Sequence, residues 1–239
     1  MSIHLINEDY KLTIKKIVKS NLKVNAIITD PPYGVSRKHQ LGFSNMGRAG
    51  MDYGEWDYNI RPTEWIKLIN PIIHPDGCLI TFCDWKNFSL IVNELELQGF
   101  YIKDLIRWEK LNPMPRNVKS RYVMDVEFAI CAVKNPKKWT FNKPISAPYL
   151  KPKFISSIVA GGSNRIHPTQ KSLKLMEFLI ENHTKKGELV FDPFGGSFTT
   201  GLAAFNLNRS FIGSEINKVY YEKSLSRFNC KISTELSGQ

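Results

Sequence analysis

The chain has 239 residues, of which 42% are apolar and 23% are charged, a balance typical of a folded globular protein and not of a disordered one. No apolar run reaches the ~18 residues that a membrane helix needs, and the N-terminus lacks the apolar core of a signal peptide, so we expect a cytoplasmic protein. The formal net charge of +11 attracts polyanions and favours nucleic acid as a partner, although a lysine-rich surface without such a partner has the same composition.

Apolar runs alternate with helical patterns along the chain. The expected strands are residues 24–29, 78–83, 126–133, 188–191 and 210–213, and the expected helices are residues 63–74, 87–99, 172–187, 199–208 and 218–228. Gly99 and Gly187 stand where two of these helices should stop. The alternation predicts an α/β fold with a mostly parallel sheet, helices on both faces, and a ligand crevice beyond the C-terminal ends of the strands.

Two stretches interrupt this alternation. Residues 34–60 hold five glycines with basic and aromatic side chains, and a loop of this length is usually functional or mobile. Residues 134–166 are rich in proline and lysine with aromatic residues between them: Trp139, Phe141, Tyr149 and Phe154. Each stretch is either a plain insertion or a surface for a polyanion, with cations on phosphates and rings on sugars or bases.

The strand expected at residues 24–29 runs into Asp30-Pro31-Pro32-Tyr33. Two consecutive prolines remove two backbone donors and fix two φ angles, so this strand end is rigid. A turn alone needs only Gly, Asn or Ser. The tetrapeptide is therefore either a stiff structural turn or a rigid mount for a carboxylate and an aromatic ring.

A second strand end, at Phe191-Asp192, leads through Pro193 and a glycine turn to a helix that starts near Thr199. Gly195 and Gly196 allow the backbone to turn tightly and to approach a ligand, and the helix start presents free N–H groups. The next expected strand ends in Glu215, about twenty residues on, which suits a hydrogen bond to ribose hydroxyls.

The spacing of this turn matches neither the GxGxxG of pyrophosphate binders nor the phosphate loop GxxxxGK[ST]. A ligand with a ribose and a carboxylate but no phosphate fits better, and S-adenosylmethionine is such a ligand. Its carboxylate would use the helix-start N–H groups or the hydroxyls of Ser197, Thr199 and Thr200. Asp192 would lie near its ammonium group.

The DPPY of residues 30–33, followed by HPTQK at 167–171 and FDPFGGS at 191–197, resembles the β-class DNA amino-methyltransferases, in which the catalytic motif precedes the cofactor motif. The likeness covers nearly the whole chain except residues 34–60 and those after about 230. It implies a Rossmann-like class I methyltransferase fold, one domain over residues 1–239 with 34–60 as a mobile loop and 134–166 as a short target-recognition insertion. NPMPRN at 112–117 and KWTFNKP at 138–144 are similar to adenine methyltransferases of MboII-type restriction systems.

The resemblance assigns roles at the first motif. Asp30 and the Pro31 carbonyl would each accept one N–H of the adenine amino group N6, in a base flipped out of duplex DNA, and Tyr33 would stack on that base. Pro32 completes the catalytic set and keeps the turn rigid. The implied cofactor-binding residues are Asp9, Asp30, Thr169, Gln170, Lys171, Asp192, Pro193, Phe194, Gly195, Gly196, Ser197, Thr199, Thr200 and Glu215. His167 of the same HPTQK stretch is instead a candidate structural hydrogen-bonder.

Basic residues of the interrupting stretches and of the segment near 116–121 are candidate DNA contacts, with a solvated basic loop as the alternative. They are Arg37, Lys38, Arg48, Arg116, Lys119, Arg121, Lys137 and Lys138. The four cysteines lack CxxC spacing and a nearby histidine pair, so we interpret them as reduced structural thiols and expect no metal site. A homodimer and a cognate restriction endonuclease are further candidate partners.

The chain departs from the family pattern at Phe198, where relatives have glycine, and a bulky side chain there is expected to narrow the cofactor pocket. Ser172 replaces a proline at a helix start, which we expect to be harmless. Cytosine N4 is the alternative acceptor, although relatives that act there tend to have Ser before PPY. Protein-glutamine methylation is disfavoured because its tetrapeptide usually begins with Asn. A DNA-binding protein without catalysis is the alternative from another class.

Overall fold

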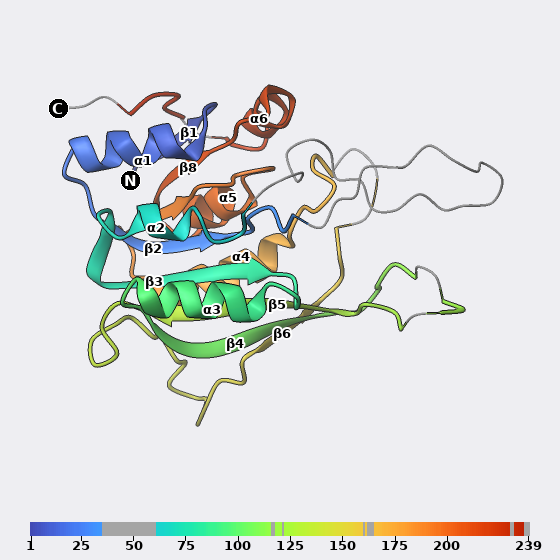
Figure 1. Ribbon diagram of the computed structural model, residues 1–239. Coiled ribbons are helices and arrows are strands. Elements are labelled where there is room, and N and C mark those ends of the chain that lie inside the picture. The colour runs from blue at the N-terminus through green and yellow to red at the C-terminus, as the bar shows by residue number, and fades with distance from the viewer. Residues whose placement is uncertain are drawn as a thin grey trace.

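Eight strands form one twisted sheet in the computed structural model, which describes residues 1–34, 61–115, 118–120, 122–159, 161, 165–229 and 232–236 (Figure 1). The strands are β1 (Ile3–Ile6), β2 (Val24–Thr29), β3 (Ile73–Cys83), β4 (Tyr101–Lys110), β5 (Val126–Val133), β6 (Lys153–Ser156), β7 (Leu189–Asp192) and β8 (Ser210–Ser214). Their order is β1-β8-β7-β2-β3-β5-β4-β6, and among these strands β5 alone runs antiparallel to its neighbours. The predicted mostly parallel sheet is confirmed.

Helices cover both faces of this sheet. One face carries α1 (Tyr10–Lys19), α2 (Ile66–Ile69) and α3 (Phe88–Leu97), and the other carries α4 (Leu173–His183), α5 (Thr199–Asn206) and α6 (Lys218–Leu225). Ile27 of β2 belongs to the core of the first face and Ile28 to that of the second. Burial on both sides explains why the central strands are continuously apolar. None of the helices in the described ranges has both the length and the apolar character to cross a membrane.

Local signals explain several element ends. Asp9 caps α1 by accepting a hydrogen bond from Lys11 N at 2.8 Å, and Asn217 caps α6 in the same way. Gly99 follows α3 with a φ of +75°, as expected for a glycine after a helix. Gly187 also has a positive φ, but α4 already ends at His183, so the expected stop at Gly187 is wrong by one turn.

The helix expected over residues 63–74 is the clearest error. The structure has only the four residues of α2 there, and β3 begins at Ile73. Pro71 has no N–H to continue the helix, and the β-branched Ile72 and Ile73 that follow favour a strand. The sequence pattern also did not predict β1, α1, β4 or β6.

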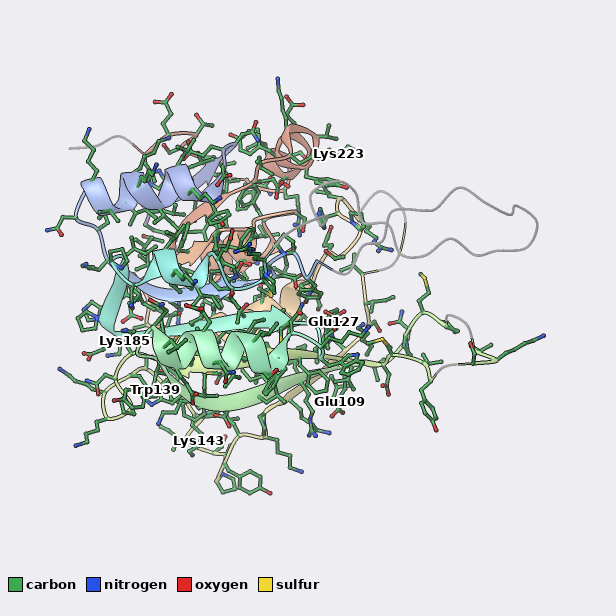
Figure 2. The ribbon with its side chains drawn as sticks, in the orientation of Figure 1. Glu109, Glu127, Trp139, Lys143, Lys185 and Lys223 are labelled. Atoms are coloured by element: carbon green, nitrogen blue, oxygen red, sulfur yellow. The ribbon has the colours of Figure 1, made fainter. Side chains whose placement is uncertain are left out.

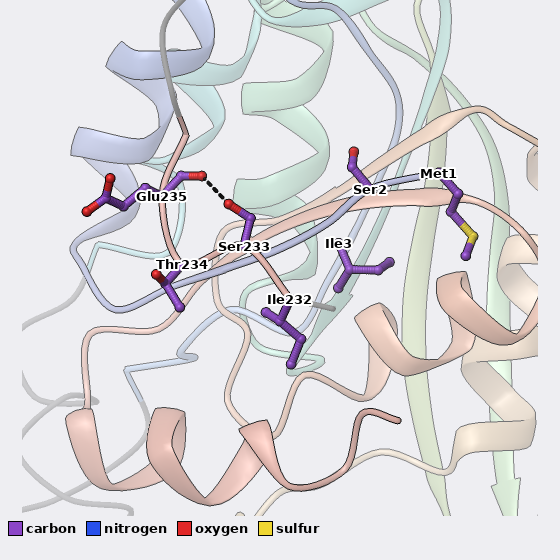
Figure 3. A pocket seen from close by; sticks show the side chains of 7 residues that line it. All are labelled: Met1, Ser2, Ile3, Ile232, Ser233, Thr234 and Glu235. Atoms are coloured by element: carbon purple, nitrogen blue, oxygen red, sulfur yellow. Dashed lines mark hydrogen bonds between the residues drawn. The ribbon is translucent and has the colours of Figure 1, made fainter. Parts of the chain in front are cut away.

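The C-terminal segment 232–236 lies along β1, where Ser233 N donates to Ile3 O at 2.9 Å and Leu5 N donates to Ser233 O at 3.0 Å. A hollow of about 530 Å³ lies between this segment and the first three residues (Figure 3). It contains a single acid, Glu235, and β8 and β7 separate it from β2. This hollow is therefore remote from the strand ends at which the motifs lie.

Candidate active site

One edge of the sheet collects the ends of β2, β4 and β7, because these strands run in the same direction, and also the start of the reversed strand β5. Asp30 follows β2, Asp192 ends β7, and Glu127 is the second residue of β5. Lys110 ends β4. Acids and cations from four strands therefore meet where the sequence predicted a ligand crevice.

The Asp30 carboxylate is held on both oxygens. Tyr33 donates its hydroxyl to Asp30 Oδ1 at 2.5 Å, and the Lys171 ammonium pairs with Oδ2. The Tyr33 carbonyl in turn accepts a hydrogen bond of 2.7 Å from Asn87 Nδ2 at the start of α3. The rigid turn thus has a fixed carboxylate, and the expected stacking aromatic is also a hydrogen-bond donor to it.

Lys171 is buried between two carboxylates. Its Nζ lies 3.0 Å from Glu127 Oε2, and Lys110 Nζ lies 2.8 Å from Glu127 Oε1. Lys110, Glu127, Lys171 and Asp30 therefore form a row of alternating charge. Sequence reasoning missed Glu127 and Lys110, because only the pairing of β4 with β5 brings them to the HPTQK lysine.

Burial raises the pKa of Asp30 and the charge of Lys171 opposes this rise. Burial would lower the pKa of Lys171, but Asp30 and Glu127 reverse the effect and raise it. Burial would raise the pKa of Glu127, but Lys171 and Lys110 lower it. Lys171 is therefore charged and supports the ionised form of both acids.

Asp192 joins the two sequence motifs. Its Oδ1 accepts hydrogen bonds from Thr29 Oγ1 at 2.7 Å and from Phe194 N at 3.1 Å, and its Oδ2 accepts one from Thr200 Oγ1 at 2.7 Å. Burial raises the pKa of Asp192 to about 6, although these hydrogen bonds lower it. The last residue of β2 therefore connects the Asp30 turn directly to the glycine turn.

Glu215 holds the glycine turn in place through hydrogen bonds. Its two oxygens accept hydrogen bonds of 2.7 Å from Gly196 N and from Asn217 N. Gly196 has a φ of +53°, which favours glycine. Arg227, which sequence reasoning missed because it lies outside every motif, donates to Ser197 O and to Thr199 Oγ1.

Phe198 does not line the cavity at the turn. Its side chain is fully buried in the core, edge-on to Phe211 and Tyr221, each with a centroid distance of 6.3 Å. Gly195 makes room for it, since a Cβ on Gly195 would lie 2.3 Å from the Phe198 ring. The expected narrowing of the pocket by this ring is therefore not what the structure shows: the ring lies beneath the turn.

A cavity of about 40 Å³ opens between the two motifs. A typical ligand pocket holds ~300 Å³ or more, so in this conformation only part of a nucleoside fits between these side chains. The residues that line it are Asp30, His167, Thr169, Gln170, Lys171, Met176, Asp192, Phe194, Gly195, Gly196, Ser197, Thr199 and Thr200. Most of the expected cofactor residues are therefore brought together.

Three expected cofactor residues lie outside this lining. Asp9 caps α1, although the ring of the next residue, Tyr10, packs on Phe194 with a centroid distance of 4.8 Å. Pro193 uses its carbonyl to accept a hydrogen bond from Ser214 Oγ at 3.0 Å. Glu215 hydrogen-bonds to the turn at Gly196 N. Their cofactor contacts stay predictions.

His167 lines the same cavity as a neutral residue. Burial, together with the charges of Lys171 and Arg165, lowers its pKa to about 4. Its Nδ1 lies 3.1 Å from Thr169 Oγ1, and its ring packs edge-on against Tyr220 with a centroid distance of 4.4 Å. These contacts support the structural role considered for this histidine.

The DNA candidates fall into separate groups. Arg37, Lys38, Arg48, Arg116 and Arg121 lie outside the described residues, as does the expected mobile loop beyond Gly34. Lys119 is exposed in the connection from β4 to β5, at the edge that carries Asp30. Of the described candidates, Lys119 alone follows a strand that ends at this edge.

Lys137 and Lys138 lie at the other edge, because β5 runs backwards and the chain leaves it away from Asp30. Lys138 Nζ lies 3.5 Å from Asp76 Oδ2 near the start of β3. Figure 2 shows Trp139 and Lys143 on the opposite side of the molecule from Glu127. The structure therefore does not bring these two lysines to the site.

Three of the four aromatic residues expected to contact bases pack against rings of α4. Trp139 stacks on His183 with a centroid distance of 5.7 Å, and Phe141 packs on both rings. Phe154 packs on Phe178 of α4 at 5.1 Å, and Tyr149 is exposed. Trp139, Phe141 and Phe154 therefore connect the insertion to α4.

No group of metal-binding side chains was found within the described ranges. Cys78, Cys83 and Cys131 are buried free thiols, and Cys230 lies outside those ranges.

Two type II methyltransferases are similar to this chain in sequence. The type II methyltransferase M2.LlaDCHI of Lactococcus lactis subsp. cremoris is 31% identical over 94% of this chain and 88% of that protein. The type II methyltransferase M2.DpnII of Streptococcus pneumoniae is 32% identical over 88% of this chain and 84% of that protein. The resemblance seen in the motifs therefore extends over nearly the full length.

The solved structure of the M1.HpyAVI–SAM complex is similar with a TM-score of 0.75 and 43% identity, over 95% of this chain and 100% of that one. This likeness confirms the Rossmann-like methyltransferase fold. The profile of a family described as DNA methylase matches residues 24–226. The chain belongs to this N6_N4_Mtase family of DNA methylases.

Proposed function

We propose that this DNA methylase transfers a methyl group from S-adenosylmethionine to N6 of an adenine flipped out of duplex DNA. The observation that carries the proposal is the fixed Asp30 carboxylate at the end of β2, joined to the glycine turn through the 2.7 Å hydrogen bond from Thr29 to Asp192. The DPPY turn and the glycine turn are thus joined in one site.

The side chains at the turn suit this cofactor by their chemistry. The buried Asp192 carboxylate would face its ammonium group, and the Ser197, Thr199 and Thr200 hydroxyls would face its carboxylate. Glu215, already bonded to Gly196 N, has further lone pairs for ribose hydroxyls. S-adenosylmethionine, when bound, supplies a methyl group activated by a positively charged sulfur. M1.HpyAVI, whose structure is similar, was solved with this cofactor.

The protein's own task is to prepare the amine. The lone pair of an exocyclic amine is delocalised into the base, so the nitrogen is a weak nucleophile. Asp30 Oδ and the Pro31 carbonyl would each accept one N–H, which draws the nitrogen toward tetrahedral geometry and directs its lone pair. As the C–N bond forms, the bond between the methyl group and the sulfur would break and leave a neutral thioether. The amine loses one proton, and the Asp30 carboxylate is placed to receive it.

The base must leave the duplex to reach this site, at a cost of a few kcal/mol. Tyr33 is half buried beside Asp30, and its ring would contact the face of the flipped-out base. The net charge of +11 would attract the phosphates of the duplex, and the exposed Lys119 at this edge would contact them. We propose a homodimer and, given the type II methyltransferases among the relatives, a cognate restriction endonuclease as further partners.

Labelled S-adenosylmethionine and plasmid DNA test this function. We expect N6-methyladenine in the digested nucleosides, a loss of at least 100-fold in the Asp30→Ala variant, of the size that acid–base groups contribute, and cofactor binding that survives in that variant. The family name covers N4 as well as N6 methylases. N4-methylcytosine as the main product would overturn the adenine assignment and establish the alternative acceptor.

A further inference from the structure

Glu127 is a partly buried acid with no role so far in the proposed reaction. It stands at the start of β5, far in sequence from both motifs, and yet its Oε2 lies 3.0 Å from the ammonium that pairs with Asp30. This oxygen is buried, and Lys171 forms an ion pair with it. Lys171 is therefore held between the carboxylates of Asp30 and Glu127.

The other oxygen of Glu127 is anchored by Lys110 Nζ at 2.8 Å, from the neighbouring strand β4. Exposed ion pairs contribute little to stability, but this group has one oxygen fully buried and a cation on each side. The carboxylate is therefore fixed in place opposite Asp30, with Lys171 between them.

This arrangement has a consequence for Asp30. An ammonium that paired with Asp30 alone would neutralise it and would compete with the substrate amine for Oδ2. A second carboxylate on the far side draws the same ammonium away and leaves Asp30 its negative character. Two cations and two acids then balance over the whole row.

We propose that Glu127 is a positioning residue for methyl transfer, which shares the Lys171 ammonium with Asp30 and so leaves Asp30 able to accept a hydrogen bond from the substrate amine. The inference rests on the proposed function of the same site. It assigns to β5 a part in the reaction although β5 carries neither motif.

A matched control lies one strand away. Glu109 of β4 has a side chain that is 31% exposed, against 28% for Glu127, and it also pairs with a lysine, since Lys153 Nζ lies 3.2 Å from its Oε2. Figure 2 shows the two acids on the same side of the molecule, with Glu109 farther out on the sheet. Among the described residues Glu109 pairs with neither Lys171 nor Asp30, so its replacement removes an ion pair from a position of similar exposure.

The pH dependence of the methylation rate distinguishes a positioning role of Glu127 from a purely structural one. The groups that face Asp30 are Lys171, Tyr33, Glu127, Asp192 and Cys83. The negative charge of Glu127 raises the pKa of Asp30, so its removal lowers that pKa. The acid limb of the methylation rate should therefore move to lower pH in Glu127→Gln.

The experiment is single-turnover methylation of duplex DNA by the full chain, measured from pH 5 to pH 8 with labelled S-adenosylmethionine. We expect Glu127→Gln to lower the plateau rate about 10- to 100-fold, as for outer partners of active-site ligands, and to shift the acid limb downward. Glu127→Asp, which keeps the charge, should keep the limb and recover part of the rate. Glu109→Gln should match the wild type.

A second variant distinguishes an electrostatic effect on Asp30 from a folding defect. Lys110→Met leaves Glu127 less neutralised, so the acid limb should move in the opposite direction, to higher pH. Calorimetric titration with S-adenosylmethionine shows whether each variant keeps its cofactor site. An unshifted limb with an unchanged rate in Glu127→Gln, or the same shift in Glu127→Gln and Lys110→Met, overturns the inference.

The two proposals fail in different ways. If the wild type produces N4-methylcytosine, the adenine assignment is wrong, while the comparison of Glu127 with Glu109 still stands. If the wild type produces N6-methyladenine and Glu127→Gln behaves like Glu109→Gln, only the role of Glu127 is wrong.

Discussion

A single hydroxyl links the two halves of the site. Thr29 is fully buried at the end of β2, and its Oγ1 donates to Asp192 Oδ1 on the neighbouring strand. Sequence motifs predicted Asp30 and Asp192 as functional residues, because each follows an apolar run and precedes a special turn. They did not predict that Thr29 joins them, since strand pairing decides that contact.

We expect Thr29→Val, which keeps the shape and removes the donor, to lower the free energy of unfolding by about 1–3 kcal/mol, because a buried acceptor loses a partner. Urea unfolding measures the change. Thr234→Val is the control, since Thr234 is exposed in the C-terminal segment and should change stability by less than ~0.5 kcal/mol. Equal effects at the two positions would contradict the importance of the Thr29 contact.

The Gly195 position tests the placement of Phe198. An added Cβ would lie 2.3 Å from the Phe198 ring, so Gly195→Ala should destabilise the protein by about 1–3 kcal/mol through overpacking. Gly161→Ala is the control, because a Cβ there meets nothing within 4 Å. Thermal unfolding compares the two. A double variant with Phe198→Leu should recover part of the loss, and no recovery would argue against this packing.

At the scale of elements, sequence patterns worked best where a strand is central and buried. The expected strands at 24–29 and 126–133 coincide with β2 and β5. The patterns failed at 63–74, where Pro71 divides a helix from a strand, and at β6, whose four residues gain their partner only from β4. The direction of a strand could not be predicted either. Nothing in residues 126–133 indicates that β5 is reversed, so the sequence did not predict at which edge Lys137 and Lys138 lie.

The C-terminal end of α4 should make stability depend on pH. Burial lowers the pKa of His183 to about 4, against 6.5 in the unfolded chain, and its buried Nδ1 has no hydrogen-bond partner among the described residues. The unfolded state therefore binds more protons between pH 6.5 and pH 4, so stability is full above that window and falls as pH falls through it.

Replacement by phenylalanine isolates this effect. Urea unfolding of the wild type should lose roughly 1–2 kcal/mol more than His183→Phe between pH 7 and pH 5. The ring of the introduced phenylalanine can keep the stacking contact that His183 makes with Trp139. His167, whose pKa is also about 4, supplies a similar loss in both proteins and cancels from the difference. Parallel pH curves for the two proteins would contradict the assignment.

At the scale of the whole molecule, the excess of positive charge acts on DNA through its placement. Lys119 lies beyond the end of β4, at the Asp30 edge, whereas Lys137 and Lys138 lie at the other edge and Lys138 pairs with Asp76. Composition predicted the sign of the partner's charge. The composition could not predict at which edge of the sheet each lysine lies.

DNA binding measured by fluorescence anisotropy over a salt series tests this placement. Affinity should fall steeply with salt, and Lys119→Ala should reduce the slope of log K against log salt by about one unit, as expected for one phosphate contact. The pair Lys137→Ala and Lys138→Ala should leave that slope unchanged. A smaller slope in this pair, or a flat response in the wild type, would refute the assignment of edges.

The reversal of β5 has a consequence for how such an enzyme acquires its target. The chain departs from the sheet at Lys110 and rejoins it at Val126 on the side where chemistry takes place, but the excursion after Val133 begins on the back. Exchanging residues 111–125 between relatives should therefore transplant sequence preference. Lengthening residues 134–152 should add chain at the opposite edge of the sheet and leave the sequence preference unchanged.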